Sequence, residues 1–95
     1  MKVAWTDEAK AHLAGIYRYI ESDAPFYAVQ TVDKLTRRAE QLIVHPRSGR
    51  IVPKYDDENL RELIVRPYRL IYRVKPDRID IIAVFHGAQQ LPDSL

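Results

Sequence analysis

The spacing of apolar residues divides the chain into a helical first half and a strand-forming second half. Residues 2–5 alternate, with Val3 and Trp5 on one face, which predicts a short strand. Thr6 is a suitable N-cap for a helix that follows, because its hydroxyl can accept one of the free backbone N–H groups. The apolar residues of this helix recur at helical spacing. They are Ala9, Leu13, Ile16, Tyr17 and Ile20.

A second helix is predicted to begin at Pro25, since proline fits the first turn of a helix. His45-Pro46 ends it, because a residue before proline is pushed out of helical geometry. The short connection at residues 22–24 predicts an antiparallel helical hairpin. This helix has the clearest apolar period in the chain. Its members are Val29, Val32, Leu35, Ala39, Leu42 and Ile43.

Three strands are predicted after a polar loop at residues 46–59, namely 60–65, 68–74 and 78–86. The connections between these strands are so short that the strands must form antiparallel hairpins. The centre of the last strand is apolar on both faces, as is typical of an interior strand. The predicted fold class is therefore α+β. A short N-terminal strand precedes an antiparallel helical hairpin packed on one face of an antiparallel sheet, in the order β-α-α-β-β-β.

Composition narrows the classes of function that the chain can have. A length of 95 residues predicts one domain, and 46% hydrophobic with 29% charged residues excludes disorder. The absence of cysteine excludes disulfides, thiolate zinc sites and a thiol nucleophile. The three histidines lack metal-ligand spacing, and the three glycines form no phosphate-binding loop, so we expect no metal or cofactor.

No apolar run approaches the roughly 20 residues of a membrane span, so we expect no contact with a membrane. The first five residues lead directly into charged residues, which does not fit a signal peptide. We therefore expect a cytoplasmic protein.

The net charge of +2 hides a local cluster of arginines on the predicted strands. Arg69 and Arg73 are four residues apart on one strand and project from the same face. Because the helices cover only one face of the sheet, we expect this face to be open. Guanidinium groups and interleaved aromatic rings can bind phosphates and stack bases. The cluster comprises Arg61, Arg66, Arg69 and Arg73 with Tyr68 and Tyr72, opposed by Glu62. Alternatively, the arginines are solvated strand residues paired with Glu62, Asp77 or Asp80.

His86 ends the most apolar strand, immediately before Gly87. Its side chain is expected on the face opposite Ile79, Ile81 and Phe85, from which it could approach the arginines. A histidine there can act as a general acid or base near neutral pH. The alternative is a strand-end histidine bonded to a neighbouring carbonyl. His12 is expected at the border of the apolar stripe of the first helix.

An ordered set of short motifs resembles the RelE/ParE toxin superfamily over nearly the whole chain. The set comprises Trp5-Thr6 opening a helix, the Ile20 helix end, His45-Pro46 with Gly49-Arg50, Leu60-Arg61-Glu62, residues 68–74 (YRLIYRV) and His86-Gly87. The resemblance implies the fold above, in a single toxin domain at residues 1–95. It implies the toxin of a type II toxin–antitoxin operon. It also implies a cognate antitoxin from the same operon, which wraps the toxin and through which alone operator DNA is bound.

The superfamily contains two activities that this chain matches unequally. RelE-like toxins cut mRNA in the ribosomal A site without a metal, using basic residues. ParE-like toxins poison DNA gyrase, and no catalytic residues are established for them. Arg69 matches the strand arginine of the nuclease pattern. Glu62 and Ile64 lie about where its paired lysines are expected, Gln89 replaces a basic residue, and no tyrosine follows Tyr72.

The depleted basic set favours a ParE-like gyrase inhibitor that acts by binding. A developing phosphorane needs placed cations, and losing one donor costs about 10²–10³ in rate. Candidate target-binding or phosphate-binding residues are Arg61, Arg66, Arg73, Tyr72 and Gln89. The alternative is a ribosome-dependent mRNA endonuclease that uses Arg69 and His86, with Arg61 or Lys54. A third possibility is an inactive family member that serves as an antitoxin-bound corepressor.

Overall fold

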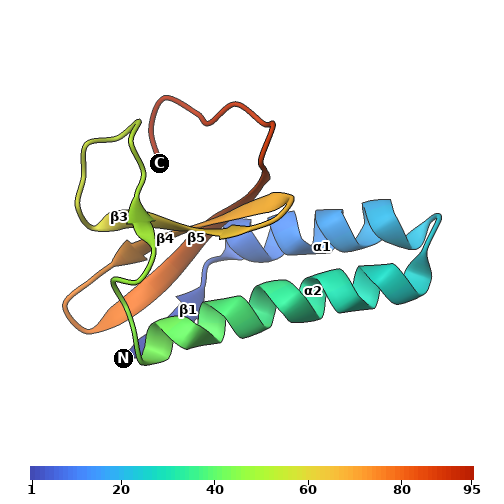
Figure 1. Cartoon of the computed structure of the whole chain (residues 1–95), viewed down its shortest axis with the longest axis horizontal. Coiled ribbons are helices and arrows are strands. Elements are labelled where there is room, and N and C mark those ends of the chain that lie inside the picture. The colour runs from blue at the N-terminus through green and yellow to red at the C-terminus, as the bar shows by residue number, and fades with distance from the viewer.

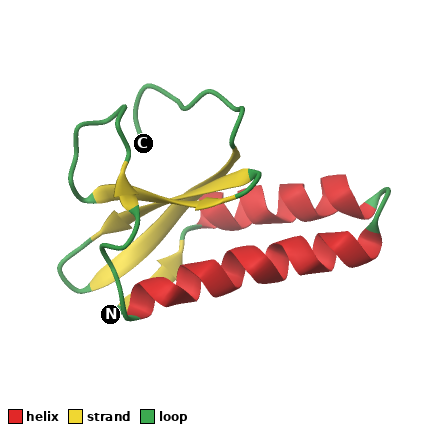
Figure 2. Ribbon diagram, viewed as in Figure 1, coloured by secondary structure: helices red, strands yellow, loops and turns green.

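Two helices pack on one face of a five-stranded mixed sheet in the computed structural model, which describes residues 1–95 (Figures 1 and 2). The strand order in the sheet is β1-β5-β4-β3-β2. The α+β prediction is confirmed. The elements are β1 (Lys2–Trp5), α1 (Asp7–Glu21), α2 (Pro25–Glu40), β2 (Arg50–Ile51), β3 (Leu60–Val65), β4 (Tyr68–Val74) and β5 (Arg78–His86). No helix has the length and apolar character that a membrane span requires.

Strands β3, β4 and β5 form the antiparallel meander that the short connections predict. Strand β1 joins it in parallel, with Val3 opposite Ile79. The prediction of a purely antiparallel sheet was thus too narrow, because no tight turn fixes the direction of β1 relative to β5. Strand β2 lies within the segment predicted to be loop. It pairs with β3, where Arg50 lies opposite Glu62.

Both helices begin where the sequence predicts. The N-cap Thr6 accepts the N–H of Ala9 at 3.2 Å, and its hydroxyl donates to the carbonyl of Ile81 at 2.8 Å. This one side chain therefore starts α1 and ties it to β5. Helix α2 begins at Pro25 and ends earlier than predicted, because the chain tightens into a 3₁₀ turn over Gln41–Ile43.

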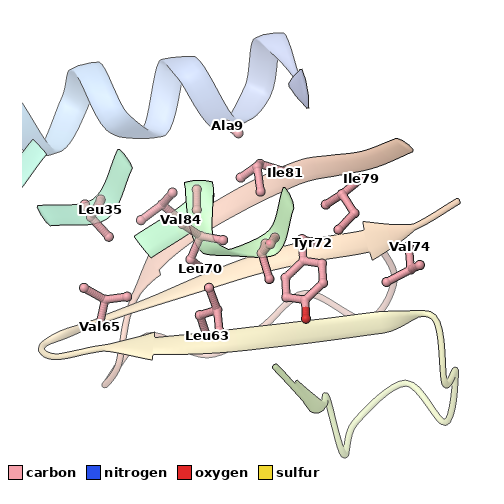
Figure 3. Packing of buried hydrophobic residues seen from close by; sticks show 12 residues of the cluster. Ala9, Leu35, Leu63, Val65, Leu70, Tyr72, Val74, Ile79, Ile81 and Val84 are labelled. Carbon is pink, nitrogen blue, oxygen red and sulfur yellow. The ribbon is translucent and has the colours of Figure 1, made fainter. Parts of the chain in front are cut away.

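The main core lies between the helices and the sheet (Figure 3). Leu35 of α2 is fully buried against the sheet, and Leu42 of the 3₁₀ turn is buried as well. Tyr72 of β4 belongs to the same core, and its hydroxyl accepts the N–H of Gly49 at 2.9 Å. The hydroxyl is thus buried with a partner, as a polar atom in a core must be. The other members are Ala9, Ala39, Leu63, Val65, Leu70, Val74, Ile79, Ile81 and Val84.

The opposite face of the sheet is covered, contrary to the prediction of an open face. The segment around β2 and the C-terminal tail at residues 87–95 both lie on this side (Figure 1). A second cluster is buried beneath them, comprising Val52, Leu60, Ile71, Ala83, Phe85 and Leu91. Lys54 Nζ donates to the carbonyl of Leu91 at 2.7 Å, and Tyr55 donates to the carbonyl of Pro92. The helices cover one face only, but irregular chain covers the other.

Candidate functional site

A buried carboxylate joins two arginines on the outer face of the sheet. Glu62 Oε1 lies 2.6 Å from Arg69 Nε, and Glu62 Oε2 lies 2.7 Å from Arg50 Nε. The Glu62 side chain is fully buried, while Arg69 is 18% exposed and Arg50 is 60% exposed. For Arg69, the predicted alternative of pairing with Glu62 is confirmed, but the side chain is largely buried rather than solvated. Arg50 was absent from the predicted cluster, because only the pairing of β2 with β3 places it opposite Glu62.

The two arginines keep Glu62 ionised despite its burial. Burial by itself raises the pKa of this carboxyl, because it disfavours the charged form. The hydrogen bonds and positive charges of Arg69 and Arg50 outweigh that effect, and the pKa falls below its ordinary value. Glu62 is therefore a buried anion held between the two arginine cations.

Arg61 and Arg73 do not pair with Glu62, so the predicted arginine cluster divides. Arg61 bonds the carbonyls of Glu58 at 3.0 Å and Gly49 at 2.9 Å. Arg73 Nη1 donates to Asp57 Oδ2 at 3.0 Å, and its Nη2 donates to the carbonyl of the last residue. Both side chains thus hold irregular segments against the sheet.

Two further predicted residues also lie apart from the paired arginines. The Tyr72 side chain is buried in the main core, and burial raises the pKa of its hydroxyl. It therefore offers no surface to a ligand. Lys54 reaches the C-terminal tail, where it lies 3.7 Å from Asp93.

His86 lies on the face opposite Phe85, as predicted, but the prediction that it also lies opposite Ile79 and Ile81 is wrong because β5 contains an irregularity. Ile81 lies opposite Tyr72 and Ala83 lies opposite the preceding residue of β4, so Ile82 is the extra residue of a β-bulge. A bulge reverses which face the following residues occupy. His86 therefore lies on the helix-facing side of the sheet with Ile81, whereas Phe85 faces the outer side.

His86 nevertheless lies beside several predicted or aromatic side chains at the end of β5. Its ring lies edge-on to Tyr68, with ring centroids 5.8 Å apart. His86 Nδ1 accepts the backbone N–H of Ala88 at 3.2 Å. The backbone N–H of His86 donates to Gln89 Oε1 at 3.0 Å. The alternative of a histidine bonded to a neighbouring carbonyl is wrong in its partner, because the ring accepts a backbone N–H group instead.

Three adjoining hollows surround the β3–β4 turn, and we call them together the turn-end site. The first, of about 670 Å³, is lined by Arg50, Arg66 and Arg69 together with His86. It shares Arg66 and Tyr68 with a hollow of about 220 Å³ beside α2. It shares Tyr68 and His86 with a groove of about 530 Å³ beside α1. No carboxylate lines any of the three, so the site is basic and aromatic.

His12 has a role that the sequence alone did not indicate. Strand β1 pairs with β5 only as far as Ile81, so the following edge of β5 has no neighbouring strand. His12 of α1 fills this gap, since its Nδ1 accepts the N–H of Val84 at 3.1 Å. The centroid of its ring also lies 5.2 Å from the ring centroid of Phe85. The helix thereby satisfies a backbone group that would otherwise lack a partner.

Comparisons with known proteins agree with this fold. Residues 3–91 match the family model described as the ParE toxin of the type II toxin–antitoxin system parDE. The Sinorhizobium fredii protein Y4kP, which is named as a toxin, is 33% identical over 99% of this chain and 96% of its own length. The toxin RelE3 of Caulobacter vibrioides is 34% identical over 86% of this chain and 89% of its own length.

A solved chain of the chromosomal ParDE toxin–antitoxin system of P. aeruginosa has the same fold. It superposes with a TM-score of 0.76 and covers 90% of this chain and 95% of its own. The two sequences are 24% identical, so this likeness concerns the fold alone.

Proposed function

Because the chain belongs to the family of ParE toxins of type II toxin–antitoxin systems, we propose that it inhibits growth by binding DNA gyrase rather than by cutting RNA. The observation that carries this proposal is the buried Glu62 between Arg50 and Arg69. A nuclease would need the charge of Arg69 for a phosphate whose negative charge increases during cleavage. Here a carboxylate inside the chain already neutralises part of that charge.

Three neighbouring positions support the same conclusion. Ile64 extends from β3 opposite Arg69 with an apolar side chain, where the nuclease pattern has a lysine. Gln89 is bonded to the backbone of His86 and supplies no positive charge beyond the strand. His86 Nδ1 is held by the N–H of Ala88, which leaves Nε2 as its only free nitrogen. The site therefore has fewer positive groups near Arg69 than the nuclease pattern has, which supports binding rather than catalysis.

Purified toxin added to gyrase and relaxed plasmid should reduce supercoiling, and induction without antitoxin should trigger DNA-damage signalling. The same induction should leave transcripts uncut at codon positions. Cleaved messenger RNA with undiminished supercoiling would contradict the proposal. A toxin without effect on growth would favour an inactive family member that serves as a corepressor with its antitoxin.

A ribosome-dependent endonuclease is the second candidate, because a relative over most of the chain is named RelE3. Arg69 and His86 would then be the catalytic pair, since both line the same 670 Å³ hollow. In that case Arg69→Lys and His86→Ala should each abolish mRNA cleavage in a translation mixture while thermal unfolding remains cooperative. Retained cleavage in both variants would exclude these residues from catalysis.

A cognate antitoxin is the protein partner that we propose from family membership. A partner that binds only the folded toxin raises its apparent stability by mass action. Co-expression with the neighbouring gene product should therefore raise the melting temperature of the toxin. Equal melting temperatures with and without that product would argue against this pairing.

A further inference from the structure

Gly15 lies in the interior of α1, where glycine destabilises a helix relative to alanine. Nothing inside the chain requires a glycine there, because a Cβ at this position would meet no atom within 4 Å. Gly15 lies on the same stripe of α1 as His12 and Tyr19, and all three line the 530 Å³ groove. The missing side chain therefore widens a groove that the chain itself leaves empty.

The groove over Gly15 has the lining that a flat heterocyclic ring requires. Tyr19 lies at the edge of the groove and is 82% exposed. Tyr68 and His86 line the side of the groove toward the sheet. Aromatic side chains offer stacking faces to any base. Gln89 also lines the groove; its Oε1 accepts the His86 backbone N–H, and its amide nitrogen can donate hydrogen bonds to a ligand.

The adjoining hollow has the lining that a phosphate requires. Glu62 engages Arg50 and Arg69 only through their Nε atoms, which leaves the terminal nitrogens of both guanidinium groups without a partner in the chain. The Arg66 side chain makes no ion pair and no hydrogen bond within the chain, and it lines the same hollow. The buried Glu62 carboxylate thus orients two cations without facing a ligand itself.

We propose that the turn-end site binds single-stranded nucleic acid without cutting it. One base occupies the groove over Gly15, and the adjacent phosphates bind Arg50, Arg66 and Arg69. An acidic peptide would satisfy the arginines as well. An acidic peptide has no flat ring to fill the aromatic groove over Gly15, so the observations favour the nucleic acid. This inference rests on the proposed function, because a ribosome-dependent endonuclease would cut the strand at the same hollow.

The experiment measures fluorescence anisotropy of a labelled oligodeoxythymidylate of about a dozen nucleotides, titrated with the full-length toxin. The strand should bind, and its affinity should fall as salt increases. A duplex of the same length, an abasic strand and a poly-glutamate peptide should each bind more weakly. The abasic strand isolates the contribution of the base groove, and the peptide tests for a general anion site.

Variants separate the site from the stability of the fold. Gly15→Ala should weaken binding of the thymidylate strand several-fold while raising the melting temperature, because alanine favours the helix. Tyr19→Ala should weaken binding about five-fold or more. Phe26→Ala is the matched control, since Phe26 is 75% exposed at the same end of the hairpin and lines none of the three hollows.

The arginines are tested by the salt dependence of binding. Arg66→Ala should reduce the slope of log affinity against log salt by about 0.7, as expected for one lost phosphate contact. Arg37→Ala is the control, because Arg37 is an exposed cation of α2 that pairs with Asp33. Absence of binding, equal affinity for the duplex, the abasic strand or the peptide, or unchanged affinity in Gly15→Ala would each overturn the proposal. Gyrase inhibition could persist in every one of these cases.

Discussion

The two faces of the sheet are stabilised by different means. On the helix side, two regular helices bury a continuous cluster of 12 residues, and this core contains Leu35, Leu70 and Tyr72. On the outer side, irregular chain buries six residues, and Leu91 of the tail is one of them. Polar contacts supplement this smaller cluster, including the bond from Lys54 to the tail. One face depends on apolar packing, and the other combines a little packing with many side-chain to backbone bonds.

This difference matters because the paired arginines lie on the outer side. Arg73 donates hydrogen bonds to Asp57 and to the carbonyl of Leu95, and Arg61 donates to the carbonyl of Gly49 in the segment before β2. Half of the predicted arginine cluster is therefore used to hold irregular segments of the chain in place. The remaining cations, at the β3–β4 turn, are the ones available to a ligand.

The largest expected effect is on the helix side. Leu70→Ala removes a fully buried side chain between regular elements that cannot collapse into the space. We expect a loss of about 4 kcal/mol in the free energy of unfolding, measured by urea denaturation. Ile64→Ala is the control on β3, since Ile64 is exposed and should cost far less. Similar losses in both variants would show that the main core is not where stability resides.

Gly49→Ala tests the contact at which the two sides meet. A Cβ there would lie 2.6 Å from the carbonyl oxygen of Glu62 and 2.6 Å from the hydroxyl of Tyr72. We expect a loss of about 3 kcal/mol from overpacking and a weakened hydrogen bond, measured in the same way. Tyr72→Phe in the Gly49→Ala background should recover part of it. Normal stability of the single variant would mean that the β2 segment moves freely.

Leu91→Ala tests the outer cluster directly. The tail can shift to fill part of the space that the side chain leaves, so we expect a loss of about 2 kcal/mol, at the low end for leucine. Hydrogen exchange should increase in the β2 segment and in residues 87–95 while α1 and α2 stay protected. Uniform loss of protection across the helices would show that the two faces unfold as one unit.

The smallest expected effect concerns pH and Glu62. Its pKa in the folded protein is lower than in the unfolded chain, so the folded state is favoured above the unfolded pKa. That stabilisation should disappear as the pH falls through the lower, folded-state pKa. Glu62→Gln should be less stable than the wild type at neutral pH, and the difference should narrow in acid. A difference that stays constant with pH would show that the Glu62 charge is unimportant.

Asp80 is the matched comparison for this titration. Hydrogen bonds from Arg78 and Lys75 lower its pKa, but it lies at the far end of β5 from the turn-end site. Asp80→Asn should also lose acid-dependent stability, yet it should leave nucleic-acid binding unchanged. If Asp80→Asn and Glu62→Gln changed the affinity for nucleic acid equally, Glu62 would have no specific role in the turn-end site.

Most of the elements were predictable because their signals are local. The Thr6 cap, Pro25 at the start of α2 and the short turns between β3, β4 and β5 each depend on a few adjacent residues. The outer layer was not predictable in the same way. Residues 46–59 contain few apolar positions, and only the distant partner strand β3 shows that two of them form β2.

The candidate site was predicted only in part. Arg66, Arg69 and His86 were named from the sequence and do line one hollow. Arg50 was missed because it is separated from Glu62 along the chain and meets it only across the sheet. The side of the sheet that His86 occupies was predicted wrongly, because the one bulge residue, Ile82, cannot be recognised within an apolar run.

The sequence by itself determined the helical hairpin, the three-stranded meander and the superfamily, because caps, turns and apolar periods act over short distances. Only the tertiary structure decided how charges and faces are used. It buried Glu62 between two arginines, turned His86 toward the helices and covered the outer face with the tail. The physical reason is that ionisation, burial and side-chain orientation depend on neighbours across the sheet. Those neighbours are distant in the chain, and no local pattern records them.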